Sequence, residues 1–217
     1  MPGLANQRAY WDTAGAGKTF THPIDFAWLS ELRPSARIVD YGCGYGRLAG
    51  LARQHGYTGI EGVDTSASLV ERARAKHPDL TFRVLPDPPA LPYPDASVDA
   101  ALLIAVLTCI PTDDGQRRLI AELGRILRPG GLLYVSDLVL QTDPRNVARY
   151  RRHATAYGAY GIFETDDGAV CRHHDPAWLH TLLLDEFAVT ATRELTVETM
   201  NAHPANALQL LARRPLG

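Results

Sequence analysis

The sequence predicts an α/β fold with a doubly wound, mostly parallel sheet of seven strands and an antiparallel hairpin at one edge. Short apolar runs alternate with helical patterns between residues 36 and 140, which is typical of right-handed βαβ units. Two final β-like runs follow each other without a helical pattern, so we expect them to form the edge hairpin. A chain of 217 residues with 46% apolar residues suits one such domain.

Five apolar runs are expected to form the parallel part of the sheet. These strands are predicted at residues 37–41, 59–64, 80–85, 98–107 and 132–137. The fourth run is apolar at nearly every position, as in a strand that helices cover on both faces. Helices are predicted between the strands, from Gly46 to about Gly56, from the N-cap Ser66 to a residue before Pro78, and from about Asp113 to Leu127. The last of these has an apolar face and is stopped by Pro129-Gly130-Gly131.

The last third of the chain has a different pattern. We expect a helix at residues 144–157, two short strands within residues 160–173, and a helix capped by Asp175 that runs to Leu184. The two runs that close the chain, at residues 187–198 and 206–213, then make the edge hairpin.

Charge and cysteine content exclude several classes of function. The formal net charge is −2, and the one local basic cluster, Arg149, Arg151 and Arg152, is interpreted as a solvated helix face, so nothing indicates nucleic-acid or anionic-membrane binding. Cys43, Cys109 and Cys171 are odd in number and far apart, which indicates neither a disulfide framework nor a metal site. We recognise no signal peptide and no apolar stretch of membrane-spanning length. The sequence therefore predicts a cytoplasmic protein without a metal.

The stretch IVDYGCGYGR, residues 38–47, predicts a ligand site at the first strand-to-helix turn. Gly42, Gly44 and Gly46 lack Cβ atoms, which lets a ligand approach the backbone and the N–H groups at the start of the helix. Asp64 ends the second strand, 18 residues beyond Gly46, and is placed to accept hydrogen bonds from both hydroxyls of a ribose.

The residue before the glycines separates two classes of ligand. Dinucleotide-binding folds use G-x-G-x-x-G, whereas this chain has G-x-G-x-G with Asp40 two residues before the first glycine. A carboxylate there would repel a pyrophosphate, but it could lie close to a cationic amino-acid group, directly or through water. Asp40 therefore argues against a dinucleotide.

The chain resembles the class I S-adenosylmethionine-dependent methyltransferases over residues 36–140. VDYGCGYG is similar to the family's first motif and GVD, at residues 62–64, to its second. In the segment at residues 86–101 the resemblance implies that Asp87 contacts the adenine amino group, with Leu85 and Pro86 beside the ring. AVLTCIP and LGRILRPGGLLYVSD are similar to the family's fourth-strand exit and fifth-strand region. The implied cofactor-binding residues are Asp40, Gly42, Cys43, Gly44, Gly46, Asp64, Thr65, Pro86, Asp87, Ile104 and Ala105.

The resemblance also divides the single domain, residues 1–217, into three parts. These are an N-terminal helical lid at residues 1–35, a cofactor-binding core at residues 36–140, and acceptor-side elements at residues 141–217. In the lid, Phe26, Trp28 and Leu29 are expected to pack on the sheet. The candidate acceptor-binding residues are Trp11, Phe20, His22, Thr108, His153 and Tyr157.

The chemistry needs few catalytic groups, because the sulfonium of the cofactor makes its methyl group electrophilic. A base is required only for an acceptor that must lose a proton. We name His174, His173 and Tyr10 as candidates, because Asp175 or a backbone carbonyl could orient one imidazole of the pair. In the alternative interpretation, Asp175 is a helix cap and the two histidines lie on opposite faces of a strand end.

The sequence thus predicts a methyltransferase that uses S-adenosylmethionine, releases S-adenosylhomocysteine, and methylates an O, N, S or C nucleophile of a small molecule, with secondary metabolism as one setting. Three alternatives stay open. They are a peptide or protein methyltransferase, a methyltransferase-like protein that binds the cofactor without methyl transfer, and an NAD(P)-dependent oxidoreductase. We expect a monomer or a homodimer.

Overall fold

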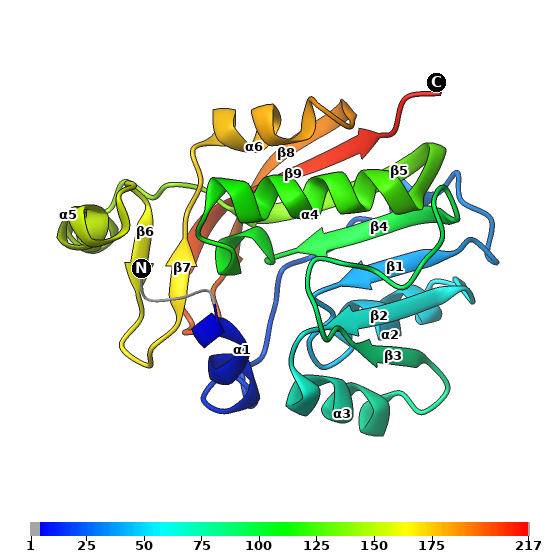
Figure 1. Cartoon of the computed structure of the whole chain (residues 1–217), viewed down its shortest axis with the longest axis horizontal. Coiled ribbons are helices and arrows are strands. Elements are labelled where there is room, and N and C mark those ends of the chain that lie inside the picture. The colour runs from blue at the N-terminus through cyan, green and yellow to red at the C-terminus, as the bar shows by residue number, and fades with distance from the viewer. Residues whose placement is uncertain (1–4, 217) are drawn as a thin grey trace.

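A seven-stranded sheet forms the centre of the computed structural model, which describes residues 5–216 (Figure 1). The strand order is β3-β2-β1-β4-β5-β9-β8. β9 is antiparallel to its two neighbours, β5 and β8, whereas the remaining pairs are parallel. This confirms the doubly wound sheet and the edge hairpin that the sequence predicts.

The elements follow the predicted order. The sheet consists of β1 Ile38–Tyr41, β2 Ile60–Asp64, β3 Thr81–Val84, β4 Val98–Ile104, β5 Leu127–Leu138, β8 Ala188–Glu198 and β9 Pro204–Arg213. A separate hairpin is made of β6 Ile162–Glu164 and β7 Val170–Arg172. The α-helices are α1 Ala5–Asp12, α2 Arg47–Gln54, α3 Ala67–Lys76, α4 Asp113–Ile126, α5 Pro144–Tyr157 and α6 Pro176–Leu183, and the 3₁₀ turns are η1 Phe26–Leu29 and η2 Leu107–Cys109.

The helices begin where the sequence has capping residues. The Ser66 hydroxyl accepts from the backbone N–H of Leu69 at 3.2 Å, and the Asp175 carboxylate accepts from the backbone N–H of Ala177 at 2.8 Å. The fourth strand is shorter than predicted. It ends at Ile104, because Ala105 has a φ of 58° and turns the chain into η2.

Apolar side chains pack on both faces of the sheet. One core lies between the sheet and α4 and α6, and includes Leu119, Leu123 and Leu183. The other lies between the sheet and α2, α3 and η1, where Leu29 is fully buried and Phe26 and Trp28 pack at the edge, as expected. No helix among residues 5–216 is long and apolar enough to cross a bilayer.

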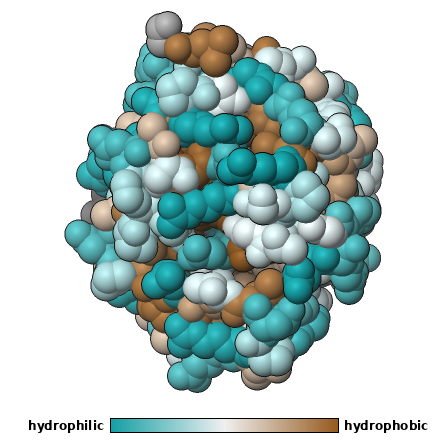
Figure 2. Space-filling view, turned by 90° about the vertical axis from the view of Figure 1, so that its right-hand side faces the viewer, coloured by the Kyte–Doolittle hydropathy of each residue, from teal (hydrophilic) through white to brown (hydrophobic). Residues whose placement is uncertain are grey.

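The carboxyl ends of the parallel strands lie on the side of the sheet where the N-terminal helix α1 packs. In Figure 1 the arrowheads of β1, β2 and β4 point toward the side where α1 and the β6–β7 hairpin lie. The opposite side of the molecule, seen in Figure 2, is covered mainly by hydrophilic residues with small apolar groups between them. The fold therefore leaves the carboxyl ends as the place for a ligand, as in other open α/β sheets.

Candidate functional site

A cavity of about 550 Å³ opens at the carboxyl ends of the central strands. Predicted residues from three loops line it, namely Gly42 and Gly44 after β1, Asp64 and Thr65 at the end of β2, and Ile104 and Ala105 at the end of β4. The fold brings these residues together from positions as far apart as 42 and 105 in the chain. This is the arrangement that the sequence predicts for a cofactor site.

The glycine turn after β1 has the backbone geometry that the spacing predicts. Gly42 and Gly44 have positive φ angles of 72° and 53°. A Cβ atom on Gly42 would lie 2.5 Å from Cγ2 of Val106, and one on Gly44 would lie 3.3 Å from Cε2 of Phe20. Larger residues would therefore be strained at both positions and would fill the space next to the backbone.

Asp64 connects the glycine turn to the second strand. One carboxylate oxygen accepts from the N–H of Gly44 at 2.8 Å, and the other accepts from the N–H of Ser66 at 2.9 Å. Burial raises the pKa of this carboxyl, while these backbone hydrogen bonds act in the opposite direction. A carboxylate has about four acceptor positions. Asp64 therefore has the capacity to accept two ribose hydroxyls from the cavity that it lines.

Three predicted cofactor residues lie behind the turn rather than in the cavity wall. Gly46 lies close to Phe82, since a Cβ atom there would be 2.8 Å from the ring, and Cys43 belongs to the same core. Asp40 is almost fully buried, one of its oxygens has no hydrogen-bond partner, and burial raises its pKa to about 7. Direct contact with Asp40 is therefore not supported, but the unpartnered oxygen fits a water-mediated link to a cationic amino group.

The loop after β3 forms the other end of the cavity. Asp87 lines it as predicted, together with Leu85, Pro88 and Pro89, whereas Pro86 is exposed and does not. Arg8 donates to the carbonyl oxygens of Leu85 at 2.9 Å and Pro86 at 2.8 Å, so α1 holds this loop. The sequence contains no motif that would have identified Arg8.

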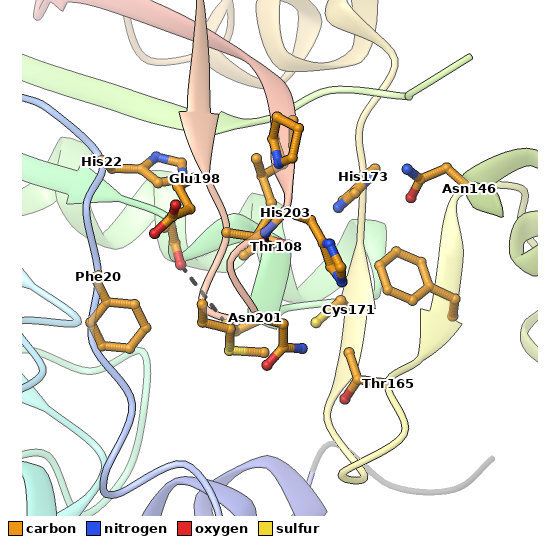
Figure 3. Close-up of a pocket in the computed structure, with 18 of the residues that line it drawn as sticks. Phe20, His22, Thr108, Asn146, Thr165, Cys171, His173, Glu198, Asn201 and His203 are labelled. Atoms are coloured by element: carbon orange, nitrogen blue, oxygen red, sulfur yellow. Dashed lines mark hydrogen bonds between the residues drawn. The ribbon is translucent and has the colours of Figure 1, made fainter. Parts of the chain in front are cut away.

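A second, smaller cavity of about 80 Å³ lies beside the first (Figure 3). Trp11, Phe20, Ala105 and Cys109 line both cavities. The strained backbone of Ala105 thus lies where the two spaces meet. A group held in one cavity would face a group held in the other across these four residues.

Four of the six predicted acceptor residues line the second cavity, namely Trp11, Phe20, His22 and Thr108. Burial and the neighbouring Arg47 lower the pKa of His22 to about 4, so this imidazole is neutral at pH 7, and its Nδ1 has no hydrogen-bond partner. The buried hydroxyl of Thr108 is also unpartnered. Both atoms are available to a polar ligand.

The prediction is wrong for the other two residues, Tyr157 and His153, which do not line this cavity. The Tyr157 hydroxyl donates to Glu164, and its ring packs against Ile162 and Val170. His153 lies one turn earlier on α5, with its ring 6.2 Å from that of Tyr157. Both residues lie near the C-terminal end of α5, whereas the cavity contacts its first half.

His174 is wrongly predicted as a catalytic base, because it is fully buried and lines neither cavity. Its Nδ1 lies 3.1 Å from the carbonyl oxygen of Leu138, to which it can only donate, and Nε2 lies 2.8 Å from the amide nitrogen of Gln116. Burial lowers its pKa to about 3. With Asp175 as a helix cap, the structure supports the alternative interpretation of this sequence.

His173 faces the other way and lines the second cavity (Figure 3). Its Nδ1 lies 2.6 Å from the hydroxyl of Tyr150, and that hydroxyl accepts from the backbone N–H of Gln141 at 3.2 Å. When the Tyr150 hydroxyl donates to Nδ1, the ring proton of neutral His173 lies on Nε2. Burial lowers the pKa of His173 well below its usual value. His173 therefore presents an N–H donor and is not a base.

Tyr10 lines neither cavity, so a catalytic role is not supported. Its hydroxyl donates to Asp167 at 3.1 Å and its ring packs with Tyr150 and Phe163. Burial raises its pKa, and the carboxylate of Asp167 adds to this effect. Tyr10 instead attaches α1 to the β6–β7 hairpin.

Replacing His174 with alanine should lower the free energy of unfolding by about 2–4 kcal/mol, because it leaves a cavity and removes partners from Gln116 and Leu138. Urea denaturation followed by circular dichroism measures this. His153→Ala removes a partly exposed imidazole and should change stability by less than about 0.5 kcal/mol. A His174→Ala protein of unchanged stability would contradict the structural role.

Among residues 5–216, no group of three or more His, Cys, Asp or Glu side chains is arranged to hold a metal ion. The residues that the sequence interpretation missed are instead cationic or amide side chains on α5, namely Arg145, Asn146 and Arg149.

Residues 39–135 match a protein-family model described as a methyltransferase domain. The chain is 34% identical over 143 residues to 27-O-demethylrifamycin SV methyltransferase of Amycolatopsis mediterranei, covering 62% of this chain and 52% of that protein. It is 28% identical over 162 residues to ribosomal protein L11 methyltransferase of Burkholderia vietnamiensis, covering 72% of this chain and 49% of that protein. The chain thus spans about half the length of these relatives.

A solved structure from Methanosarcina mazei, described as an S-adenosylmethionine-dependent methyltransferase, has the same fold. Its TM-score is 0.83 at 22% identity, over 92% of this chain and 100% of that chain. The glycine turn, the carboxylate at the end of β2 and the topology of the sheet agree with these matches. Residues 39–135 thus match a methyltransferase domain, and the fold is that of S-adenosylmethionine-dependent methyltransferases.

Proposed function

We propose that this chain transfers a methyl group from S-adenosylmethionine to a nucleophile of a small molecule. The observation that carries the proposal is the junction of the two cavities at Trp11, Phe20, Ala105 and Cys109. The cofactor supplies an electrophilic methyl group, and in-line transfer requires the acceptor atom to face it. A cofactor held by Asp64 and the glycine turn would direct its methyl group toward this junction.

The residues around the second cavity support a positioning mechanism. Trp11 and Phe20 come from the N-terminal segment and exclude water from the junction, while Thr108 and His173 offer polar contacts to the acceptor. His22 is a neutral imidazole with an unpartnered nitrogen, and we propose that it contacts the acceptor by a hydrogen bond rather than as a base, because burial lowers its pKa to about 4.

The covering N-terminal segment favours a small acceptor over a macromolecule. Lys18 forms an ion pair with Asp167 at 2.6 Å, and the Thr21 hydroxyl donates to the carbonyl oxygen of Glu198 at 2.8 Å. These contacts join the segment to the β6–β7 hairpin and to β8, across the second cavity. One relative is named for a rifamycin and the other for a ribosomal protein, so the relatives support both classes.

Calorimetric titration with S-adenosylhomocysteine tests cofactor binding, with NADH and NADPH as competing candidates. Release of S-adenosylhomocysteine from S-adenosylmethionine in the presence of small-molecule acceptors tests transfer, and peptide pools test the protein alternative. Failure to bind S-adenosylhomocysteine at millimolar concentration would refute the proposal. Binding without transfer to any acceptor would favour a methyltransferase-like binding protein. Gel filtration tests the predicted monomer or homodimer, and fractionation tests the predicted cytoplasmic location.

Replacing Asp167 with asparagine should loosen the N-terminal segment. Lys18 lowers the pKa of Asp167 to about 2, so the ion pair is present at neutral pH, and Tyr10 donates to the same carboxylate. We expect faster hydrogen exchange across residues 13–21 and an affinity for S-adenosylhomocysteine that is lower by about two- to fivefold. Asp166→Asn, at an exposed neighbouring carboxylate, is the matched control. Equal exchange in the two variants would contradict a role for Asp167 in closure.

A further inference from the structure

The second cavity, where we place the methyl acceptor, is called the acceptor cavity below. Two arginines line it, and Arg149 is partly buried whereas Arg145 is exposed. The guanidinium carbon of Arg149 lies 3.5 Å from the centroid of the Phe163 ring, so the planar group is stacked on an aromatic face. Its Nε is buried and has no hydrogen-bond partner. The stacking fixes the plane of the guanidinium while a donor remains unsatisfied.

No carboxylate forms a direct ion pair with Arg149 in the described part of the chain. The ion pairs among residues 5–216 involve other cationic side chains, and none joins an Asp or Glu to Arg149 within 4.0 Å. Burial lowers the pKa of Arg149 and the nearby Arg145 adds to this effect, whereas Tyr150 acts in the opposite direction, so the net effect of the surroundings is to disfavour the positive charge. A partly buried cation without a counter-ion is a costly arrangement unless a ligand supplies the negative charge.

Further donors gather around the same part of the cavity. Arg145 lies one turn before Arg149 on α5 and also lines the cavity. The Nε2–H of His173 is directed there by the Tyr150 hydrogen bond to Nδ1. Asn146 lies between the two arginines in the chain, but it adds no donor, because its amide nitrogen donates to Asp143 and its unpartnered atom is the carbonyl oxygen, an acceptor (Figure 3). The acidic residue in the cavity wall, Glu198, is exposed and comes from β8 on the other side.

We propose that the methyl acceptor carries an oxyanion group that Arg149 binds, with Arg145 and His173 as additional donors. This inference deepens the proposed function and rests on it, because it identifies the chemical group at one end of the methyl acceptor. The oxyanion would lie at α5, the body of the acceptor between Phe163 and Leu138, and the nucleophile at the junction lined by Cys109 and Ala105. Carboxylates and phosphates share the chemistry, since both accept the two parallel N–H groups of an arginine fork.

Fluorine NMR titrations can test the proposal without knowledge of the natural acceptor. The probes are 4-fluorobenzoate, 4-fluorophenyl phosphate and the neutral 4-fluorobenzamide, each with and without saturating S-adenosylhomocysteine. We expect at least one oxyanion to bind about tenfold more tightly than the amide. Comparison of the benzoate and phosphate arms identifies which oxyanion fits.

Variants of α5 distinguish binding by the planar guanidinium of Arg149 from binding by a positive charge alone. Arg149→Gln should abolish the preference for oxyanions, and Arg149→Lys should retain only part of it, because lysine lacks the planar fork. Arg151→Gln removes a charge from an exposed position of the same helix and should keep the preference. Calorimetry with S-adenosylhomocysteine is run on each variant, and its affinity should stay within about twofold of wild type.

The outcomes distinguish this inference from the proposed function. Equal binding of acid and amide, no detectable oxyanion binding, or an unchanged preference in Arg149→Gln would overturn the oxyanion site. Failure of all variants and the wild type to bind S-adenosylhomocysteine would instead refute the proposed function, whatever the probes do.

Discussion

Replacing Asp64 with alanine should weaken the binding of S-adenosylhomocysteine by about 100-fold or more. The carboxylate lines the cofactor cavity at the end of β2, where it is placed to accept both ribose hydroxyls. Hydrogen bonds to a charged group contribute about 1.5–3 kcal/mol each, and two of them correspond to at least two orders of magnitude in affinity. Isothermal titration calorimetry measures the effect directly.

Controls for the Asp64 variant must separate lost ligand contacts from a disordered turn. The same carboxylate accepts from the N–H groups of Gly44 and Ser66, so unfolding curves are needed for each variant. Asp64→Asn keeps an acceptor oxygen and should lose less affinity than Asp64→Ala. Glu71→Ala removes an exposed carboxylate from α3 and should bind like wild type. An Asp64→Ala protein that keeps wild-type affinity while folded would remove Asp64 from the cofactor site.

Local rules predicted the fold and most, though not all, of the candidate cofactor residues that line the larger cavity. The glycine turn, the Asp64 position and the caps at Ser66 and Asp175 each depend on neighbouring residues in the chain. The elements that surround the cofactor cavity follow from these signals and from the alternation of strands and helices. This is why Gly42, Gly44 and Asp64 lie where the sequence indicates.

The acceptor end depended on contacts between distant segments, which spacing does not reveal. His22 meets the α5 residue Asn146 in one cavity wall only after the chain has folded. The pair His173-His174 shows the limit clearly, because alternation on a strand indicates opposite faces but not which face is the cavity. Tyr157 was misplaced for a similar reason, since which end of α5 meets the cavity depends on how the helix packs.

Replacing Gly42 with alanine should lower the free energy of unfolding by about 2–5 kcal/mol and also reduce the affinity for S-adenosylhomocysteine. Two costs add at this position. A φ of 72° is unfavourable by about 1–2 kcal/mol for an L-residue with a side chain. A Cβ atom would also lie 2.5 Å from Cγ2 of Val106, and relief of such overpacking costs about 1–3 kcal/mol.

Two further variants separate these costs. Gly56→Ala places a methyl group at a φ of 93° with no heavy atom within 4 Å, so it measures the backbone cost alone. Val106→Ala removes the clashing methyl group, and the double variant with Gly42→Ala should be more stable than the sum of the single effects by about 1–3 kcal/mol. Urea denaturation of the four proteins completes the cycle. If the double variant is simply additive and Gly42→Ala costs no more than Gly56→Ala, close packing of Val106 against the turn does not explain the glycine.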